Sequence, residues 1–327
     1  MSTREVTSRL RESVWNGSIP LEIRLDRNDC RTYDESDPYL IQFPRLSYLA
    51  LHIHKLHAFF LPSLIYPDIP ATSLWLSYEG VPLKWHYPLG LLYDLYSGAE
   101  PAYPADFDIH KHDAPSSSTT ENAQDDSATT TINSTLPWRL TIHFSSTPSP
   151  PLIALISTPS APHSTMHDLF IHAVKEADYL RTGTGKTVMF LSKEDSTQLW
   201  ESVVAHDFSR FNPVNQKLLN PQGVNLRHLP VRLYLPHKGD EGGEEVGRVR
   251  VVQSLVPIAA AGSRQPQTIG TALNQILPSL FPSRRSALLA QAVLHGAVLP
   301  LNASVEELIR TVAYLDGWLH IAIVMMG

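Results

Sequence analysis

The sequence is poor in cysteine and in charged residues. Cys30 is the only cysteine among 327 residues, so the chain can form neither an internal disulfide nor a zinc site built from several thiolates. Charged residues make up 18%, and 26 basic against 32 acidic side chains give a net charge of −6. This balance has the opposite sign to the basic surface of a dedicated nucleic-acid-binding protein. We therefore expect no nucleic-acid partner.

Long apolar runs are also missing. The best of them, residues 255–261, is short and contains Pro257, whereas a membrane-spanning helix needs about 20 apolar residues. Residues 1–15 mix basic and acidic side chains without an apolar core, which is unlike a secretory signal. We expect a cytoplasmic protein whose contact with membranes is peripheral.

An internal repeat organises the chain. Residues 61–64 (Leu-Pro-Ser-Leu) recur as residues 277–280, and residues 80–83 (Gly-Val-Pro-Leu) correspond to residues 296–299 (Gly-Ala-Val-Leu), both at an offset of 216 residues. Two independent markers with one offset indicate two copies of the same structural unit.

Each copy contains the same predicted series of elements. Alternating apolar residues predict strands, and apolar residues at three- and four-residue spacing predict helices. The order is a strand hairpin, a helix, a strand, a short turn or helix and a final strand, which is typical of the ubiquitin-like (β-grasp) roll. The expected segments are 21–25, 39–43, 48–61, 89–95 and 140–144 in the first copy, and 231–235, 249–256, 271–277, 305–313 and 319–323 in the second.

The segment between the two copies has a helical pattern. Apolar residues from Met166 to Leu180 follow helical spacing, and Thr165 and Asp168 predict a capping box at the start of that helix. A second helical tract is expected over residues 194–219.

The sequence thus predicts an α+β protein in which two ubiquitin-like (β-grasp) domains flank a helix-rich domain. Residues 97–136 are rich in Pro, Ser and Thr and have little to bury, so we expect a disordered insertion there. The expected domains are 1–144, N-terminal ubiquitin-like with this insertion; 145–163, linker; 164–226, helix-rich; and 227–327, C-terminal ubiquitin-like.

Motifs of catalytic or metal centres do not fit their required spacing. Residues 182–187 (Thr-Gly-Thr-Gly-Lys-Thr) resemble a phosphate loop, but Leu180 stands where the first glycine is required. A helix C-cap and turn are expected there instead. The histidines of residues 52–57 and 110–112 lack carboxylate or cysteine partners at a metal-binding spacing.

We therefore expect no catalytic residue, no metal and no cofactor. The enzymatic alternatives are an NTPase that uses Lys186 and a hydrolase that uses Cys30. Because Cys30 lies in a polar stretch, a loop thiol is the simpler interpretation.

Several segments resemble one known family. The longest is residues 78–95 (Tyr-Glu-Gly-Val-Pro-Leu-Lys-Trp-His-Tyr-Pro-Leu-Gly-Leu-Leu-Tyr-Asp-Leu), supported by residues 43–49, 137–144, 174–178 (Val-Lys-Glu-Ala-Asp) and 318–321 (Trp-Leu-His-Ile). On these residues the chain resembles the autophagy protein 5 family across nearly its whole length. The resemblance implies two ubiquitin-like domains around a helix-rich one, as the repeat also predicts.

The resemblance implies a function as well. Members of this family are joined through the lysine matching Lys175, the isopeptide acceptor, to the C-terminal glycine of the ubiquitin-like autophagy protein 12, by separate activating and conjugating enzymes. With the coiled-coil autophagy protein 16, the conjugate acts like a ubiquitin ligase. It promotes attachment of autophagy protein 8 to phosphatidylethanolamine, by the autophagy protein 8 conjugating enzyme, at the preautophagosomal membrane. The chain itself would be a non-catalytic scaffold; an unconjugated ubiquitin-like adaptor that binds a coiled-coil partner is the alternative.

Helical periodicity bears on Lys175 independently. It places this residue opposite the apolar stripe of its helix, on a face shared with Asp178 and Tyr179. The amine should therefore be exposed. An ordinary lysine amine is almost fully protonated at pH 7, so the conjugating enzyme must remove its proton before it can attack a thioester.

The resemblance also marks partner-binding candidates. Arg45, Trp85, His86 and Gly90 lie in the segments of the first domain that match the family. Because that domain helps to bind autophagy protein 16 in the family, the resemblance makes these four residues candidate groove or support residues.

Overall fold

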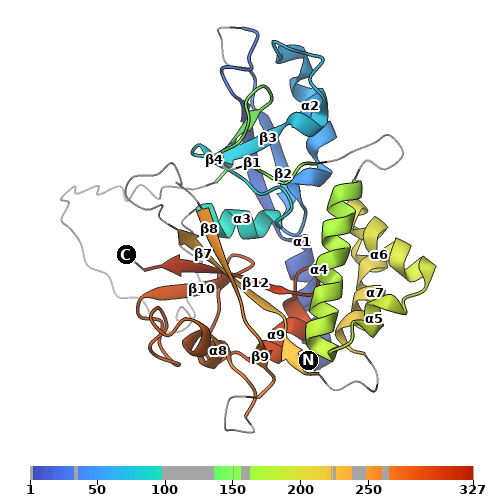
Figure 1. Ribbon diagram of the computed structural model, residues 1–327, viewed down its shortest axis with the longest axis vertical. Helices are drawn as coiled ribbons and strands as arrows, with labels where there is room; N and C mark the ends of the chain where they lie inside the picture. The colour runs from blue at the N-terminus through green and yellow to red at the C-terminus, as the bar shows by residue number, and fades with distance from the viewer. Residues whose placement is uncertain are drawn as a thin grey trace, which may run out of the picture.

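Two five-stranded sheets, a two-stranded sheet of β6 (His228–Leu229) and β9 (Val256–Pro257), and several helices make up the described part of the molecule (Figure 1). A computed structural model of the chain describes residues 3–32, 36–97, 136–149, 151–155, 163–221, 223, 226–237, 248–259 and 265–326. The predicted disordered insertion lies, apart from its ends, outside these residues. Each five-stranded sheet is paired with helices, and a helical group lies beside both sheets, so the predicted fold class is confirmed.

The first sheet has the strand order β2-β1-β5-β3-β4. β1 pairs antiparallel with β2 and parallel with β5, so the last strand of the unit lies beside the first. Alternate residues of β1 and β5 face the core, which explains their alternating sequence. The elements are β1 (Ser18–Leu25), β2 (Tyr39–Pro44), α2 (Ile53–Phe60), β3 (Trp75–Tyr78), β4 (Val81–Pro82), α3 (Leu89–Tyr96) and β5 (Trp138–His143).

The second sheet repeats this topology. Read from β8, its order β8-β7-β12-β10-β11 matches the first sheet strand for strand, with β7 and β12 parallel. The tight turn also repeats: Glu79 and Gly80 have φ of 48° and 80°, and His295 and Gly296 have 53° and 81°. The elements are β7 (Val231–His237), β8 (Arg248–Gln253), α8 (Ile269–Ile276), β10 (Ala290–Leu294), β11 (Ala297–Val298), α9 (Val305–Val312) and β12 (Leu319–Met325).

The helical group differs in two details from the prediction. The tract 194–219 is two helices, because His206 adopts a left-handed conformation and the Asp207 carboxylate accepts the backbone N–H of Arg210 at 3.2 Å as a new N-cap. The predicted capping box is wrong, since His163 occupies the N-cap without a side-chain bond. No described helix is both long and apolar enough to cross a bilayer. The helices are α4 (Ser164–Thr182), α5 (Lys186–Met189), α6 (Lys193–Ala205) and α7 (Phe208–Leu219).

An additional helix, α1 (Thr3–Asn16), was not expected from the sequence. Its anchor is Trp15, which is buried and stacks on His206 with ring centroids 4.6 Å apart. Arg11 donates a hydrogen bond to the carbonyl oxygen of Arg310 at 2.7 Å, at the last turn of α9. α1 therefore links the helical group to the second ubiquitin-like unit.

Helix α3 lies between the two sheets and contacts both β2 and β12 (Figure 1). Its Asp94 is 1% exposed and forms an ion pair with Arg45 of its own unit. The other carboxylate oxygen accepts the backbone N–H of Gly296, from the second unit, at 2.9 Å. Burial raises the pKa of Asp94, against the opposing effects of the Arg45 guanidinium and the Gly296 N–H. One buried carboxylate thus joins the two ubiquitin-like units.

Replacing Asp94 tests this junction. Asp94→Asn keeps the size of the side chain but leaves the largely buried Arg45 charge without its partner, which costs about 3 kcal/mol or more. We expect a clearly lower urea midpoint by tryptophan fluorescence. Arg139→Ala removes a 77% exposed guanidinium that lies 3.4 Å from Glu22, and Glu22 keeps its closer partner Arg24 at 2.6 Å. This change should alter stability by only about 0.5 kcal/mol. Equal effects of the two substitutions would contradict the proposed importance of the junction.

Candidate modification site

Lys175 lies on the outer face of α4. Val174 and Ala177 on either side of it are buried, whereas Lys175 is exposed, as helical periodicity predicts. The expectation for Asp178 is wrong: this residue is fully buried, and its carboxylate accepts the backbone N–H of Val188 at 3.0 Å. Tyr179, one turn beyond Lys175, is 60% exposed.

The helix that carries Lys175 is fastened to the second ubiquitin-like unit by Trp318. The indole N–H of this fully buried residue donates to the carbonyl oxygen of Ala173 at 2.9 Å. The Arg232 guanidinium lies 3.8 Å from the centre of the Trp318 ring and forms an ion pair with Glu176. Because these contacts flank Lys175 in sequence, the amine projects from a fixed segment of helix.

Residues that support Trp318 are themselves buried and polar. His320 Nε2 lies 2.8 Å from an Asp316 carboxylate oxygen, and His320 Nδ1 lies 2.7 Å from the hydroxyl of Tyr234. Burial opposes ionisation of Asp316, but His320, the backbone N–H of Trp318 and the Arg232 charge together hold the pKa of this carboxyl below its usual value. No sequence pattern indicates this network, since Tyr234 reaches His320 only through the parallel pairing of β12 with β7.

The glycine-rich segment after α4 ends that helix. Gly183 has a φ of +78°, and its N–H donates to the carbonyl oxygen of Tyr179 at 2.7 Å, which is the predicted C-cap. Gly185, with a φ of +63°, starts the four-residue helix α5. The segment joins two helices, so the strand-to-helix context of a phosphate loop is missing.

Three of the four partner-binding candidates have internal contacts. The Gly90 N–H donates to the Arg45 carbonyl oxygen at 2.7 Å, and a Cβ on Gly90 would lie 3.0 Å from that oxygen. This close approach of α3 favours glycine, because a Cβ there would force the Arg45 backbone to shift. The buried Trp85 indole donates to the carbonyl oxygen of Ile153 at 2.9 Å, so part of the predicted linker is fastened to the first unit.

His86 lines a cavity between parts of the chain. This cavity, of about 400 Å³, lies where the first unit, α4 and the second unit meet. The Nδ1 atom of His86 is buried and has no hydrogen-bond partner among the residues that the structure describes. Burial, with a smaller effect of the Lys84 charge, lowers the pKa of His86 to about 4. The lining includes Tyr48, His172, Glu176, Arg232 and Tyr234.

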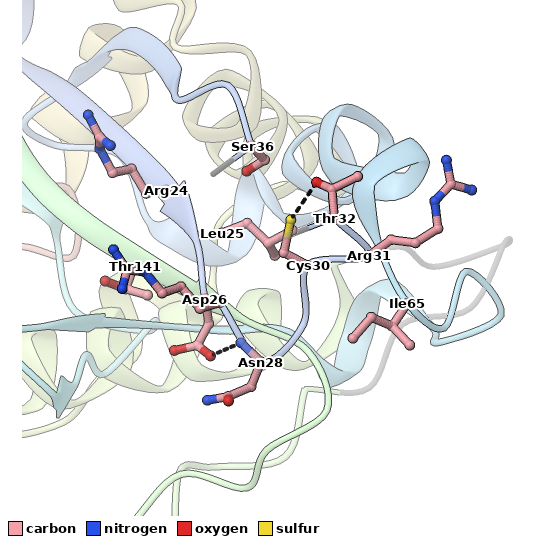
Figure 2. A pocket seen from close by; sticks show the side chains of 11 residues that line it. Arg24, Leu25, Asp26, Asn28, Cys30, Arg31, Thr32, Ser36, Ile65 and Thr141 are labelled. Carbon is pink, nitrogen blue, oxygen red and sulfur yellow. Dashed lines mark hydrogen bonds between the residues drawn. The ribbon is translucent and has the colours of Figure 1, made fainter. Parts of the chain in front are cut away.

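A larger hollow, of about 1020 Å³, lies at the far end of the first unit (Figure 2). Cys30 lines it together with Arg24, Arg27 and Arg31, and its Sγ lies 3.5 Å from the hydroxyl of Thr32. None of the eleven lining residues that the structure describes is a histidine. The hydrolase alternative therefore gains no support from this pocket.

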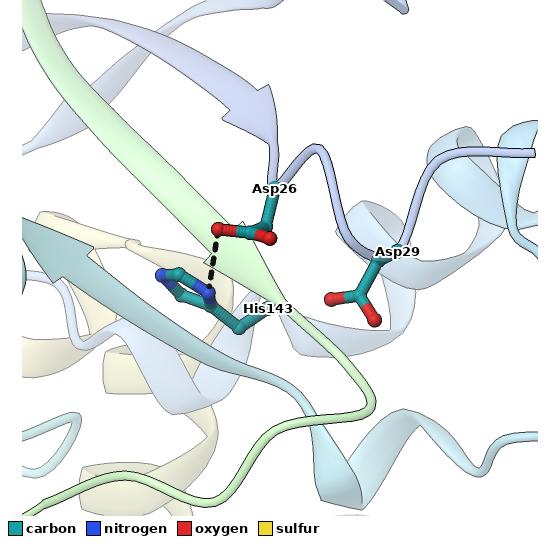
Figure 3. A group of neighbouring side chains, drawn as sticks. All are labelled: Asp26, Asp29 and His143. Atoms are coloured by element: carbon teal, nitrogen blue, oxygen red, sulfur yellow. Dashed lines mark ion pairs between the residues drawn. The ribbon is translucent and has the colours of Figure 1, made fainter. Parts of the chain in front are cut away.

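Asp26, Asp29 and His143 form a group whose ligand-type atoms lie within 4.8 Å of one another (Figure 3). The oxygens of Asp29 are already used, because they accept the backbone N–H groups of Phe144 at 2.6 Å and Ser145 at 2.9 Å. Asp26 lies 3.3 Å from His143 Nδ1. These contacts tie the end of β5 to the loop after β1, which is a structural role.

Two ubiquitin-like units around a helical group, with a lysine held outward on the first long helix of that group, define a multidomain protein of the ubiquitin-like fold. Sequence models of three domains match the chain: "Autophagy protein ATG5, UblA domain" over residues 14–144, "Autophagy protein ATG5, alpha-helical bundle region" over residues 163–221, and "Autophagy protein ATG5, UblB domain" over residues 228–323. The chain belongs to the autophagy protein 5 family. This membership assigns it a role in autophagy.

Relatives and solved structures agree with this assignment. Autophagy protein 5 of Phaeosphaeria nodorum is 74% identical, with all of both chains covered. Autophagy protein 5 of Aspergillus fumigatus is 45% identical over all of this chain and 98% of its own. The crystal structure of Kluyveromyces marxianus Atg5 has a TM-score of 0.68 at 20% identity, covering 96% of this chain and 99% of that one, and shares the fold.

Acid should weaken the structure through His86. Its folded pKa of about 4 is below the ordinary 6.5, so the unfolded chain binds a proton first as the pH falls. The stability that the neutral His86 side chain contributes is fully present above pH 6.5 and is lost as the pH falls toward 4. Between pH 7.5 and 4.5, protonation of this one group should lower the free energy of unfolding by roughly 2–3 kcal/mol. His86→Gln should lower the melting temperature at pH 7.5 but show a flatter decline to pH 4.5; parallel curves would contradict the assignment.

Proposed function

We propose that this chain is a non-catalytic autophagy scaffold that is joined through Lys175 to the C-terminal glycine of autophagy protein 12. The observation that carries the proposal is an exposed lysine on a fixed helix in a chain of the autophagy protein 5 family. With autophagy protein 16, the conjugate promotes attachment of autophagy protein 8 to phosphatidylethanolamine by its conjugating enzyme.

The chemistry needs little from this chain. The conjugating enzyme carries the modifier as a thioester and removes a proton from the Lys175 ammonium. The neutral amine then attacks the carbonyl carbon, a C–N bond forms as the C–S bond breaks, and the thiolate leaves while the nitrogen gives up a second proton. Lys175 contributes an accessible nucleophile. Activation and orientation of the reacting groups belong to the enzyme.

The partner-binding candidates divide into two roles under this proposal. Arg45 and Gly90 hold α3 in place, and Trp85 holds the segment after β5, so these three support the first unit. His86 faces the cavity between the three parts of the chain. We assign to it the contact with the coiled-coil autophagy protein 16.

We place the protein in the cytoplasm and, as part of the assembly, at the surface of the preautophagosomal membrane. Its own membrane contact is peripheral and depends on the assembly, since the sequence offers only scattered basic residues. The second candidate function is an unconjugated ubiquitin-like adaptor that binds a coiled-coil partner.

Lys175→Arg separates the two functions, because it keeps the positive charge and removes the acceptor amine. We expect wild-type protein from its own cells to include a reductant-resistant band heavier than 36.5 kDa by one small protein. Lys175→Arg should abolish that band, and the matched control Lys193→Arg, at an exposed lysine of α6, should keep it. A wild-type chain that stays unmodified at rest and under starvation would favour the adaptor.

A further inference from the structure

The helical group exposes two large apolar side chains close to Lys175. Met189 and Phe190, at the end of α5, are 71% and 79% exposed. Exposed apolar residues are ordinary when single, but a cluster beside a groove is typical of an interaction site. Phe190 lines such a groove, of about 710 Å³, between α5 and α7.

The fold holds these side chains outward. Val188, the residue before them, is buried, and its N–H is bound by the Asp178 carboxylate at 3.0 Å. The two left-handed glycines, Gly183 and Gly185, set the direction in which α5 leaves α4. The φ of +78° at Gly183 disfavours any residue with a Cβ, and a Cβ there would also meet the Arg227 side chain at 2.7 Å. The exposure of Met189 and Phe190 follows from fixed contacts.

The exposed residues continue the surface around Lys175. Tyr179, 60% exposed, lies one helical turn from Lys175, or about 6 Å along the axis. The Cβ of Tyr179 lies 4.0 Å from the position that a Cβ on Gly185 would take, directly before α5. α5, which carries Met189 and ends just before Phe190, thus starts beside the turn of α4 that follows Lys175. We call Lys175, Tyr179, Met189 and Phe190 together the acceptor strip.

A protein that delivers an acyl group to Lys175 must cover part of this strip. An interface of standard size buries about 800 Å² on each partner, which corresponds to a patch with a radius of about 16 Å. A patch of that size centred on Lys175 extends well beyond the single turn to Tyr179. Aromatic and methionine side chains are enriched in such interfaces and supply most of their binding energy.

The charge around the groove indicates what the partner carries. Lys186 and Lys217 line it. Lys217 is paired with Asp195 at 2.7 Å, and Lys186 is exposed and has no ion pair with any residue that the structure describes. Within the described part of the chain, the groove thus combines the apolar side chains of Phe190, Pro213 and Pro221 with the uncompensated positive charge of Lys186. It suits a partner surface that presents an apolar side chain next to a carboxylate.

We propose that the acceptor strip and the α5–α7 groove are the docking site for the conjugating enzyme that transfers its thioester-bound modifier to Lys175. This inference rests on the proposed function. The enzyme places an apolar side chain against Phe190 and a carboxylate against Lys186, and its catalytic cysteine then lies over Lys175. The groove provides affinity, and Lys175 provides the reacting amine.

The test is reconstituted conjugation with purified activating enzyme, conjugating enzyme and autophagy protein 12, at varied concentrations of this chain. Phe190→Ala and Lys186→Glu should each raise the acceptor concentration for half-maximal rate about tenfold, with the maximal rate within about twofold. The matched control is Tyr66→Ala, which removes a 62% exposed aromatic side chain from the first unit. It should leave both quantities unchanged. Unchanged half-maximal concentrations in Phe190→Ala and Lys186→Glu would overturn the proposal.

Direct binding of the conjugating enzyme, measured by titration calorimetry, separates this inference from the proposed function. Lys175→Arg should bind the enzyme like wild type, and Phe190→Ala about tenfold more weakly. Conjugation of Lys175→Arg together with weak binding of Phe190→Ala would refute Lys175 as acceptor and keep the docking site. Equal binding by all variants, with Phe190→Ala turning a dimer into a monomer by light scattering, would overturn the docking site in favour of a second copy of this chain.

Discussion

A buried carboxylate forms a polar junction between the two ubiquitin-like units of this molecule. Asp94 sits on a helix that contacts both sheets, and it meets an arginine of its own unit and a backbone N–H of the other. A buried charge is tolerated only when its partners are in place. Docking of the second unit therefore supplies one of the hydrogen bonds that stabilise the buried Asp94 carboxylate in the first unit. The helical group in turn depends on this arrangement, because α4 is fastened through Trp318 to the second unit.

The repeat made most of the architecture predictable. A glycine with positive φ at the same place in each copy, Gly80 and Gly296, marks a turn that only a few residue types can form, and the offset between them gave the equivalence of the strands. Boundaries within the helical group were harder to predict. His206 adopts a left-handed conformation that its residue type does not suggest, so two helices resembled one long tract.

Helix α1 escaped prediction for a physical reason. Its apolar residues Val6 and Leu10 are about half exposed, and only Trp15 is buried at its end. Polar and charged residues make up most of this helix, and its position depends on one aromatic anchor and on Arg11, which binds the end of α9. Tertiary contacts, which sequence periodicity does not reveal, decide its place.

The candidate site was predictable in part. The exposure of Lys175 follows from helical spacing, but its role as acceptor comes only from the family, because one exposed lysine has the same pattern as another. The expected exposure of Asp178 was wrong because this residue lies at the edge of the exposed face of α4. Its short side chain turns inward to accept the backbone N–H of Val188. Asp94 is the one acidic residue in the otherwise apolar helix α3, and this contrast was the sequence signal that could have marked it.

The two ubiquitin-like units are joined head to tail. The turn at Gly296 of the second unit reaches α3 of the first, while the equivalent turn at Gly80 of the first unit is exposed. When two different surfaces of a repeated unit bind each other, each added unit leaves one of these surfaces open. A series of such units can therefore continue by adding one copy after another. Here α1 packs on α9, the counterpart of α3. The surface that would receive a third unit is covered by the first helix of the same chain, so the series closes at two.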